Sequence, residues 1–172
     1  ADLIWRNLRV EWIEFYKQRW NSFYEKITTA MHKENKKVMV NSSLTRDPFE
    51  AIYRFGIDYK GLAASGVDGF IVETGAAAQD LVSGDRNRHY DYTATMMLIR
   101  AYVPDTKLIF LHVVQDHCEN FDGLNHMPTA IEKEVCSLGN IYYQRTDGNL
   151  MRSSDGFMVC LGDSIEQDEW RW

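Results

Sequence analysis

The sequence predicts an α/β protein in which a parallel sheet of about four strands carries covering helices. Helical and strand-like patterns alternate along the 172 residues. The strand-like segments are nearly continuous apolar runs, which is typical of parallel strands that are buried on both faces. Polar side chains follow each of these runs, and functional residues of parallel α/β folds gather at the carboxyl ends of the strands.

The first predicted element is a long helix over residues 3–33. Apolar side chains recur there at three- and four-residue steps, and no Pro or Gly interrupts them. We expect this stripe to belong to the core, against a large partner surface such as a sheet. Its members are Trp5, Leu8, Trp12, Phe15, Tyr16, Trp20, Phe23, Ile27 and Met31.

A short buried strand over residues 37–41 follows. Asp47 is then placed to cap a helix and Pro48 to occupy its first turn. The helical pattern runs over residues 49–65 with a break at Gly56. The remaining elements are strands over 67–73, 107–114 and 156–161, helices over 92–102 and 128–138, and a short strand near 141–143.

The length fits a single domain, residues 1–172. A complete (β/α)8 barrel takes about 250 residues. The first helix has no strand before it, and the last strand is followed only by residues 163–172. We therefore expect part of a larger (β/α)8 (TIM) barrel, or a compact half-barrel, with an open doubly wound sheet as the alternative.

The net charge and the cysteine content indicate which classes of binding partner and which cellular compartment to expect. The chain has 25 acidic and 19 basic residues, a net charge of −6, which is unfavourable for binding a phosphate backbone. No apolar run is long enough to span a bilayer. Three widely spaced cysteines suit a reducing compartment. We expect a cytoplasmic protein with neither nucleic acid nor membrane as partner.

The candidate site consists of polar residues that follow the predicted strands: Asn41, Arg46, Glu73, Asp116, His117 and Asp163. Glu73 is the strongest candidate, because a carboxyl group held among apolar neighbours can act as a general acid, and we expect Phe70 and Val72 to lie beneath it. Alternatively, Glu73 pairs with an Arg or caps the small-residue turn over residues 74–76. That turn could also cradle an anion, although it lacks the spacing of a phosphate-binding loop.

A metal site is the alternative chemistry. Asp116, His117, Glu119 and His126 lie close together in the sequence. Their spacing matches no compact metal motif such as H-E-x-x-H. We therefore predict no metal and no other cofactor, and a loop held by its own hydrogen bonds.

The order of these segments resembles the second half of (β/α)8 glycoside hydrolases of the β-galactosidase-like type. The resemblance covers about residues 10–120. It is carried by the aromatic helix, by Val38-Met39-Val40-Asn41, by Asp58-Tyr59 with Leu62-Ala63, and by Gly66-Val67-Asp68-Gly69-Phe70. It implies a barrel, a carbohydrate substrate and carboxylate catalysis. In that family the acid/base Glu comes from an earlier strand, and a nucleophilic Glu ends the strand matched by 107–114, where this chain has Gln115-Asp116.

We interpret the chain as a barrel segment of a glycoside hydrolase. Glu73 and Asp116 would form the acid/base pair. The substrate would be held by Asn41, Arg46, His117 and Asp163, with Tyr143 or Trp170 stacking on a sugar ring. A metal-dependent hydrolase and a non-catalytic barrel fragment or binding module are the alternatives. We also expect self-association into a homo-oligomer, because a half-barrel leaves strand edges and apolar surface exposed.

Overall fold

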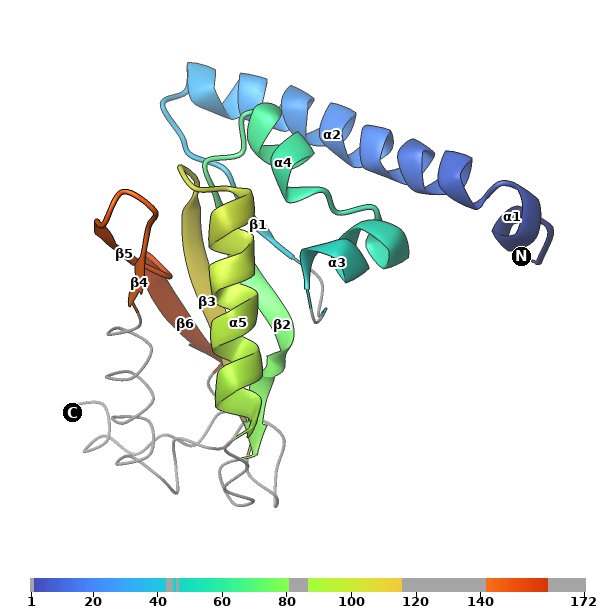
Figure 1. The fold of residues 1–172 in the computed structure, drawn as a ribbon. Coiled ribbons are helices and arrows are strands. Elements are labelled where there is room, and N and C mark those ends of the chain that lie inside the picture. The colour runs from blue at the N-terminus through green and yellow to red at the C-terminus, as the bar shows by residue number, and fades with distance from the viewer. Residues whose placement is uncertain (1, 43–44, 46, 81–86, 116–141, 161–172) are drawn as a thin grey trace.

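The computed structural model describes residues 2–42, 45, 47–80, 87–115 and 142–160. It shows a mixed α/β protein (Figure 1). The helices are α1 Asp2–Asn7, α2 Arg9–Lys33, α3 Pro48–Phe55, α4 Tyr59–Ala64 and α5 Asn87–Tyr102. The strands are β1 Met39–Asn41, β2 Gly69–Asp80, β3 Lys107–Gln115, β4 Tyr142–Gln144, β5 Leu150–Arg152 and β6 Gly156–Cys160.

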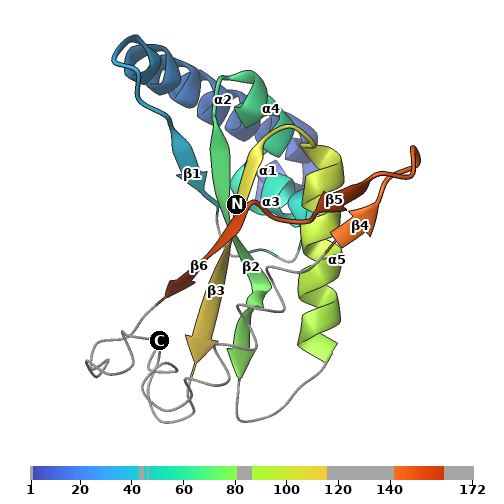
Figure 2. The ribbon, with the colours of Figure 1, turned by 90° about the vertical axis from the view of Figure 1, so that its left-hand side faces the viewer.

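A four-stranded sheet lies at the centre of the structure, in the order β1-β2-β3-β6. Every neighbouring pair in it is parallel, and the strands follow one another in chain order (Figure 2). The predicted parallel sheet and its four strands are therefore confirmed. The short strand expected near 141–143 is β4, which forms an antiparallel hairpin with β5. The sequence analysis did not predict β5.

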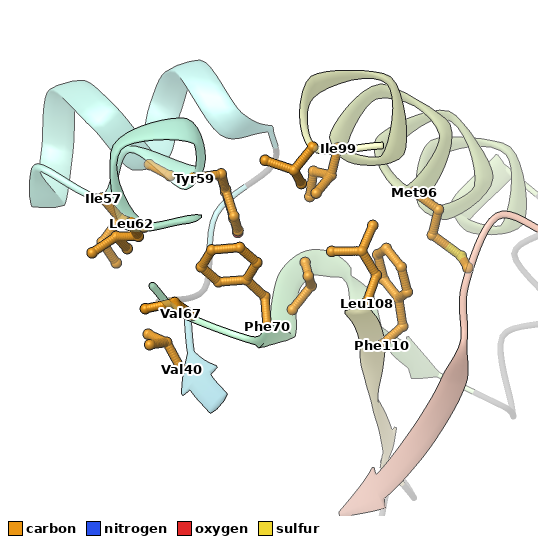
Figure 3. Packing of buried hydrophobic residues seen from close by; sticks show 13 residues of the cluster. Val40, Ile57, Tyr59, Leu62, Val67, Phe70, Met96, Ile99, Leu108 and Phe110 are labelled. Atoms are coloured by element: carbon orange, nitrogen blue, oxygen red, sulfur yellow. The ribbon is translucent and has the colours of Figure 1, made fainter. Parts of the chain in front are cut away.

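One face of the sheet forms the hydrophobic core with α3, α4 and α5. Alternate strand residues point to this face, because successive side chains of a strand lie on opposite sides. Tyr59 of α4 packs edge-on against Phe70 of β2, with ring centroids 4.9 Å apart (Figure 3). The buried cluster contains Val40, Ala51, Ile57, Tyr59, Leu62, Val67, Phe70, Val72, Met96, Ile99, Val103, Leu108 and Phe110.

The opposite face of the sheet is also largely apolar but less covered. Two rows of register partners cross it: Asn41, Ile71, Ile109 and Gly156, then Glu73, Leu111 and Met158. Leu111 is buried, whereas Met158 on β6 and Met39 on β1 are 46% and 40% exposed. Asn41 and Glu73 therefore lie beside Ile71, Ile109 and Leu111 on this face, and Lys107 lies toward its amino-terminal end.

The predicted helix start at Asp47 and the break at Gly56 are both confirmed. The Asp47 carboxylate accepts the Phe49 and Glu50 backbone N–H groups at 2.9 and 2.8 Å. Gly56 ends α3 with φ of 69°, a conformation that favours glycine. A Cβ there would lie 2.5 Å from the Tyr16 Cβ, so Gly56 also lets α2 approach α3 closely.

The prediction that the aromatic stripe is buried is wrong for most of its members. The helix is interrupted at Leu8, and α2 packs on the short helices α3 and α4 instead of on a sheet. The Trp20 Nε1–H donates to the Phe55 carbonyl at 3.0 Å, and the Thr28 hydroxyl donates to the Ser65 carbonyl at 2.6 Å. The exposed members are Trp5, Leu8, Trp12, Phe15, Trp20, Phe23 and Met31.

The prediction that a strand ends at Glu73 is also wrong. β2 continues to Asp80, and its register with β3 shifts between Glu73 and Ala78. The small residues after Glu73 therefore belong to an irregular strand. They form neither a helix cap nor a strand-to-helix turn that could cradle an anion. The physical reason is the length of β3, which extends to Gln115 and offers backbone partners to this segment.

The remaining helix predictions have different outcomes. The helix expected over 92–102 is α5, which begins earlier, at Asn87. The helix expected over 128–138 lies outside the described residues.

The strands β2 and β6 begin in the same way. Asp68 and Asp155 each precede a Gly-Phe pair. The Asp68 N–H donates to the Val38 carbonyl at 2.9 Å, and the Asp68 carboxylate accepts the Val38 N–H at 2.8 Å. Asp155 makes the same two bonds with Leu108, at 2.8 and 2.9 Å. We call these two arrangements the Asp68 clamp and the Asp155 clamp.

Candidate functional site

Glu73 is half-buried on the less covered face of the sheet. Its backbone N–H donates to the Ser42 hydroxyl at 3.1 Å, and its carbonyl accepts the Thr45 N–H at 3.3 Å. The segment that follows β1 therefore holds the Glu73 backbone from one side, just where the pairing of β2 with β3 becomes irregular. Glu73 is therefore the last residue of β2 in regular register with β3 before the irregular stretch.

Asn41 lies close to Glu73 in the sheet. It ends β1, pairs in register with Ile71, and is exposed. Since Glu73 is two residues beyond Ile71, Asn41 and Glu73 occupy diagonal positions on one face of neighbouring strands. The fold thus brings together two of the six predicted site residues. The other four, Arg46, Asp116, His117 and Asp163, lie outside the described residues.

The apolar neighbours of Glu73 differ from those expected. Phe70 and Val72 were expected beneath its carboxyl group, but both are fully buried on the helix-covered face. On the face of Glu73, the adjacent positions belong to Ile71 of the same strand and Leu111 of β3. Within the described part of the chain no ion pair involves Glu73, so the expected alternative of a surface salt bridge finds no support there.

Tyr59 lies behind this site, in the core. Burial raises the pKa of Tyr59 to about 12, and the Ser42 side chain offsets part of that rise. Among the described groups, the Tyr59 hydroxyl has no hydrogen-bond partner in standard geometry. Ser42 thus influences Tyr59 in the core, and its hydroxyl accepts the backbone N–H of Glu73.

A small cavity of about 110 Å³ lies between α2 and β1. Trp20 and Tyr24 stack in its wall with ring centroids 6.0 Å apart. The sequence analysis missed it because the aromatic stripe was assigned to the core. Its lining residues are Trp20, Tyr24, Val40, Asn41, Ile57 and Leu62.

A larger open cleft of about 530 Å³ lies at the amino-terminal ends of β3 and β6. Lys107, Tyr142, Arg152 and Asp155 contribute to its wall. The β4–β5 hairpin, which carries Tyr143, borders it. Tyr143 was expected to stack on a substrate beside Glu73, and this prediction is wrong because the hairpin lies at the opposite end of the sheet (Figure 1). Trp170 lies outside the described residues.

The metal hypothesis depends on residues that the structure does not describe. Among the described residues, no three His, Cys, Asp or Glu side chains are grouped to hold a metal ion. Asp116, His117, Glu119 and His126 all lie in the segment 116–141, outside the described ranges. No helix in the described part of the chain combines the length and the apolar character needed to cross a membrane.

The chain was compared with models of protein families, with curated proteins and with solved structures. None of the three comparisons finds a match.

Proposed function

We propose that the chain is a segment of a (β/α)8-barrel glycoside hydrolase in which Glu73 is an acid/base carboxyl group. The observation that carries this proposal is the position of Glu73 beside Asn41, on the sheet face opposite the helices. In a barrel that face is the interior, and catalytic residues lie at its carboxyl-end mouth. Asn41 ends β1, whereas Glu73 lies inside β2, where the pairing with β3 becomes irregular.

The strand order favours a barrel over an open doubly wound sheet. Four parallel strands follow one another in chain order, and the helices between them pack on one face. Consecutive units of a barrel have this arrangement, whereas a doubly wound sheet reverses its strand order near the middle.

The chemistry follows from the two side chains. Glu73, half-buried among apolar neighbours, would protonate the leaving oxygen of a glycosidic bond, and the Asn41 amide would hold a sugar hydroxyl. Glycoside hydrolysis also needs a second carboxylate, and Asp116 is our candidate because it directly follows β3, the neighbour of β2. The separation of the two carboxyl groups would set retention or inversion.

Replacing Glu73 by Gln tests the proposal, because the shape is kept and the proton donor is lost. We expect Glu73→Gln to lower turnover of an alkyl glycoside by about a hundredfold or more. An aryl glycoside with an acidic phenol as leaving group should lose much less, since that leaving group needs no proton. Both would be measured on the purified chain, after screening a panel of glycosides for the best substrate.

Glu25→Gln is the matched control, because Glu25 is an exposed residue of α2. It should leave turnover unchanged, and both variants should keep the melting temperature of the wild type. A loss below about threefold for Glu73→Gln, or an equal loss for both leaving groups, would show that Glu73 is not a general acid. A wild-type chain that hydrolyses no glycoside of the panel would contradict the proposed activity.

A further inference from the structure

The two outer strands of the sheet each have one free edge in the described structure. Among the described strands, β1 pairs only with β2, and β6 pairs only with β3. A free strand edge presents unpaired N–H and C=O groups that favour addition of another strand. The exposure of apolar side chains is also highest at these edges, at Met39 and Met158, while Ile71 and Ile109 on the central strands are more covered.

Helix α2 is a covering helix that lacks a strand on one side. Trp12, Trp20 and Phe23 form a strip along it with exposed fractions of 38%, 37% and 50%. Their spacing places them on one side of the helix, next to the residues that contact α3 and α4. In consecutive β–α units, the helix before a strand also covers the strand that precedes it. Trp20 of this strip lines a cavity together with Val40 and Asn41 of β1, so a strand added beside β1 would lie near the strip.

The cavity at the β1 edge has the size of a single side chain. Its volume is about 110 Å³, somewhat below that of the roughly 150 Å³ cavities that admit benzene. Trp20, Tyr24 and Val40 give it an apolar wall. One apolar side chain of a strand added to β1 would fill it.

We propose that a second copy of the chain supplies that strand, so that β6 of each copy pairs in parallel with β1 of the other. In this arrangement, α2 of one copy covers β6 of the other copy. It continues the strand order and direction already present in each copy. Two sheets of four make eight strands, the number whose interior side chains just fill a barrel.

The symmetry closes the assembly. With the two-fold axis along the barrel, both junctions are equivalent and no free edge is left to extend the assembly further. The carboxyl ends of all eight strands then meet at one mouth, so Asn41 of each copy lies at the same rim and Glu73 of each copy lies on the interior face below it. Only this last consequence depends on the proposed function.

The exposed apolar area at the two strand edges and on α2 is comparable in magnitude to the area that a stable dimer buries. Side chains such as Trp and Phe carry about 150–250 Å² each. Trp12, Trp20, Phe23, Met39 and Met158 together then expose about 400 Å² per copy. A standard interface buries about 800 Å² per partner, and the paired strand edges and the inner face would supply the difference.

The first test is the mass of the purified chain by light scattering at micromolar concentration. We expect twice the mass of the 20.0 kDa chain. Met158→Lys and Phe23→Asp should each weaken the dimer at least about tenfold, because each places a charge in a junction. Met97→Lys is the matched control, since Met97 is an exposed methionine on α5. It should leave the dimer intact.

The second test identifies which strands meet. Met39→Lys and Met158→Glu should each dissociate the dimer, and their combination in one chain should restore it. Restoration requires β1 of one copy to face β6 of the other, because a β1–β1 contact would bring two lysines together.

Three results would overturn the closed dimer: a wild-type monomer, a species larger than two copies, or a double variant that stays monomeric while retaining a folded circular dichroism spectrum. None of them bears on the glycosidase assay of Glu73→Gln. The two proposals can therefore fail separately.

Discussion

The Asp68 clamp and the Asp155 clamp each make two hydrogen bonds to the backbone of a neighbouring strand or segment, but a different side chain completes each clamp. The His32 ring lies 2.9 Å from the Asp68 carboxylate, and its side chain is 43% exposed. Arg100 contacts Asp155 at 2.6 Å, and its side chain is only 6% exposed. Arg100 also donates to the carbonyls of Ser153, Pro104 and Thr106.

The difference shows that the same arrangement at the start of a strand can belong to the core at one site and attach a peripheral helix at another. At β6 the planar guanidinium has enough donors to join the end of α5, the start of β3 and the start of β6 in one buried network. At β2 the His32 ring makes one exposed contact that helps to attach α2. We therefore expect the Asp155 clamp to be part of the stability of the core, and the Asp68 clamp to contribute mainly to the docking of a peripheral helix.

The largest expected effect comes from removing Arg100, in comparison with removing His32. Arg100→Met leaves three carbonyls without their donor and removes the ion pair with the partly exposed Asp155, and should lower the free energy of unfolding by about 2–4 kcal/mol. His32→Gln should cost at most about 1 kcal/mol, because its pair is exposed. Urea denaturation of both variants measures the difference. Similar losses in the two variants would contradict the comparison.

A smaller effect is expected at the glycines of the two clamps. A Cβ on Gly69 would lie 2.9 Å from the Lys107 Cβ and 3.0 Å from the Lys107 carbonyl, whereas the nearest atom to a Cβ on Gly156 is 4.0 Å away. Gly69→Ala should therefore destabilise the protein by about 1–3 kcal/mol. Gly156→Ala should be neutral or slightly stabilising. Thermal unfolding of the two variants measures this, and the reverse order would show that the close approach at Gly69 is not what requires glycine.

The smallest expected effect is a pH dependence common to both clamps. The Val38 N–H and the His32 ring lower the pKa of Asp68. Burial alone would raise the pKa of Asp155, but the Leu108 N–H and Arg100 outweigh it and the pKa is lowered. Both carboxylates therefore stabilise the fold above their unfolded pKa of 3.8. This stability is lost as the pH falls through the lowered folded values.

Asp68→Asn and Asp155→Asn should each flatten the loss of stability below about pH 4, as measured by urea unfolding at a series of pH values. Lys107→Met is the control. The exposed Lys107 ammonium lies 3.5 Å from the Asp155 carboxylate, so its loss should change the pH dependence of stability least. If the free energy of unfolding of both Asn variants falls with pH as steeply as that of the wild type, these two carboxylates do not cause the loss of stability in acid.

Local chemistry made much of the fold predictable. Asp47 and Pro48 specify a helix start through a cap and a preset φ, and Gly56 specifies its end through a left-handed backbone, so these boundaries depend on few distant contacts. The apolar runs of β2, β3 and β6 identified buried parallel strands. The sequence Asp-Gly-Phe occurs at residues 68–70 and at residues 155–157, but only the structure shows that both form the same kind of clamp.

The candidate site was predictable only in part. Asn41 and Glu73 were chosen because they follow apolar runs, and parallel pairing of β1 with β2 brings them to one face of the sheet. Which side chains surround Glu73 depended on the pleat and on register with β3, so Leu111 could not be identified as a neighbour from the sequence. The continuation of β2 past Glu73 depended likewise on the length of β3.

Most kinds of element and their order, β5 excepted, follow from the sequence alone, because backbone propensity, capping and side-chain periodicity act within a few residues. Tertiary structure decided which apolar side chains are buried. The aromatic stripe of α2 has the composition of a core face, yet Trp12 and Phe23 remain exposed because α3 and α4 are too short to cover them. Burial depends on the area that a partner surface offers, and a sequence pattern records only one side of that contact.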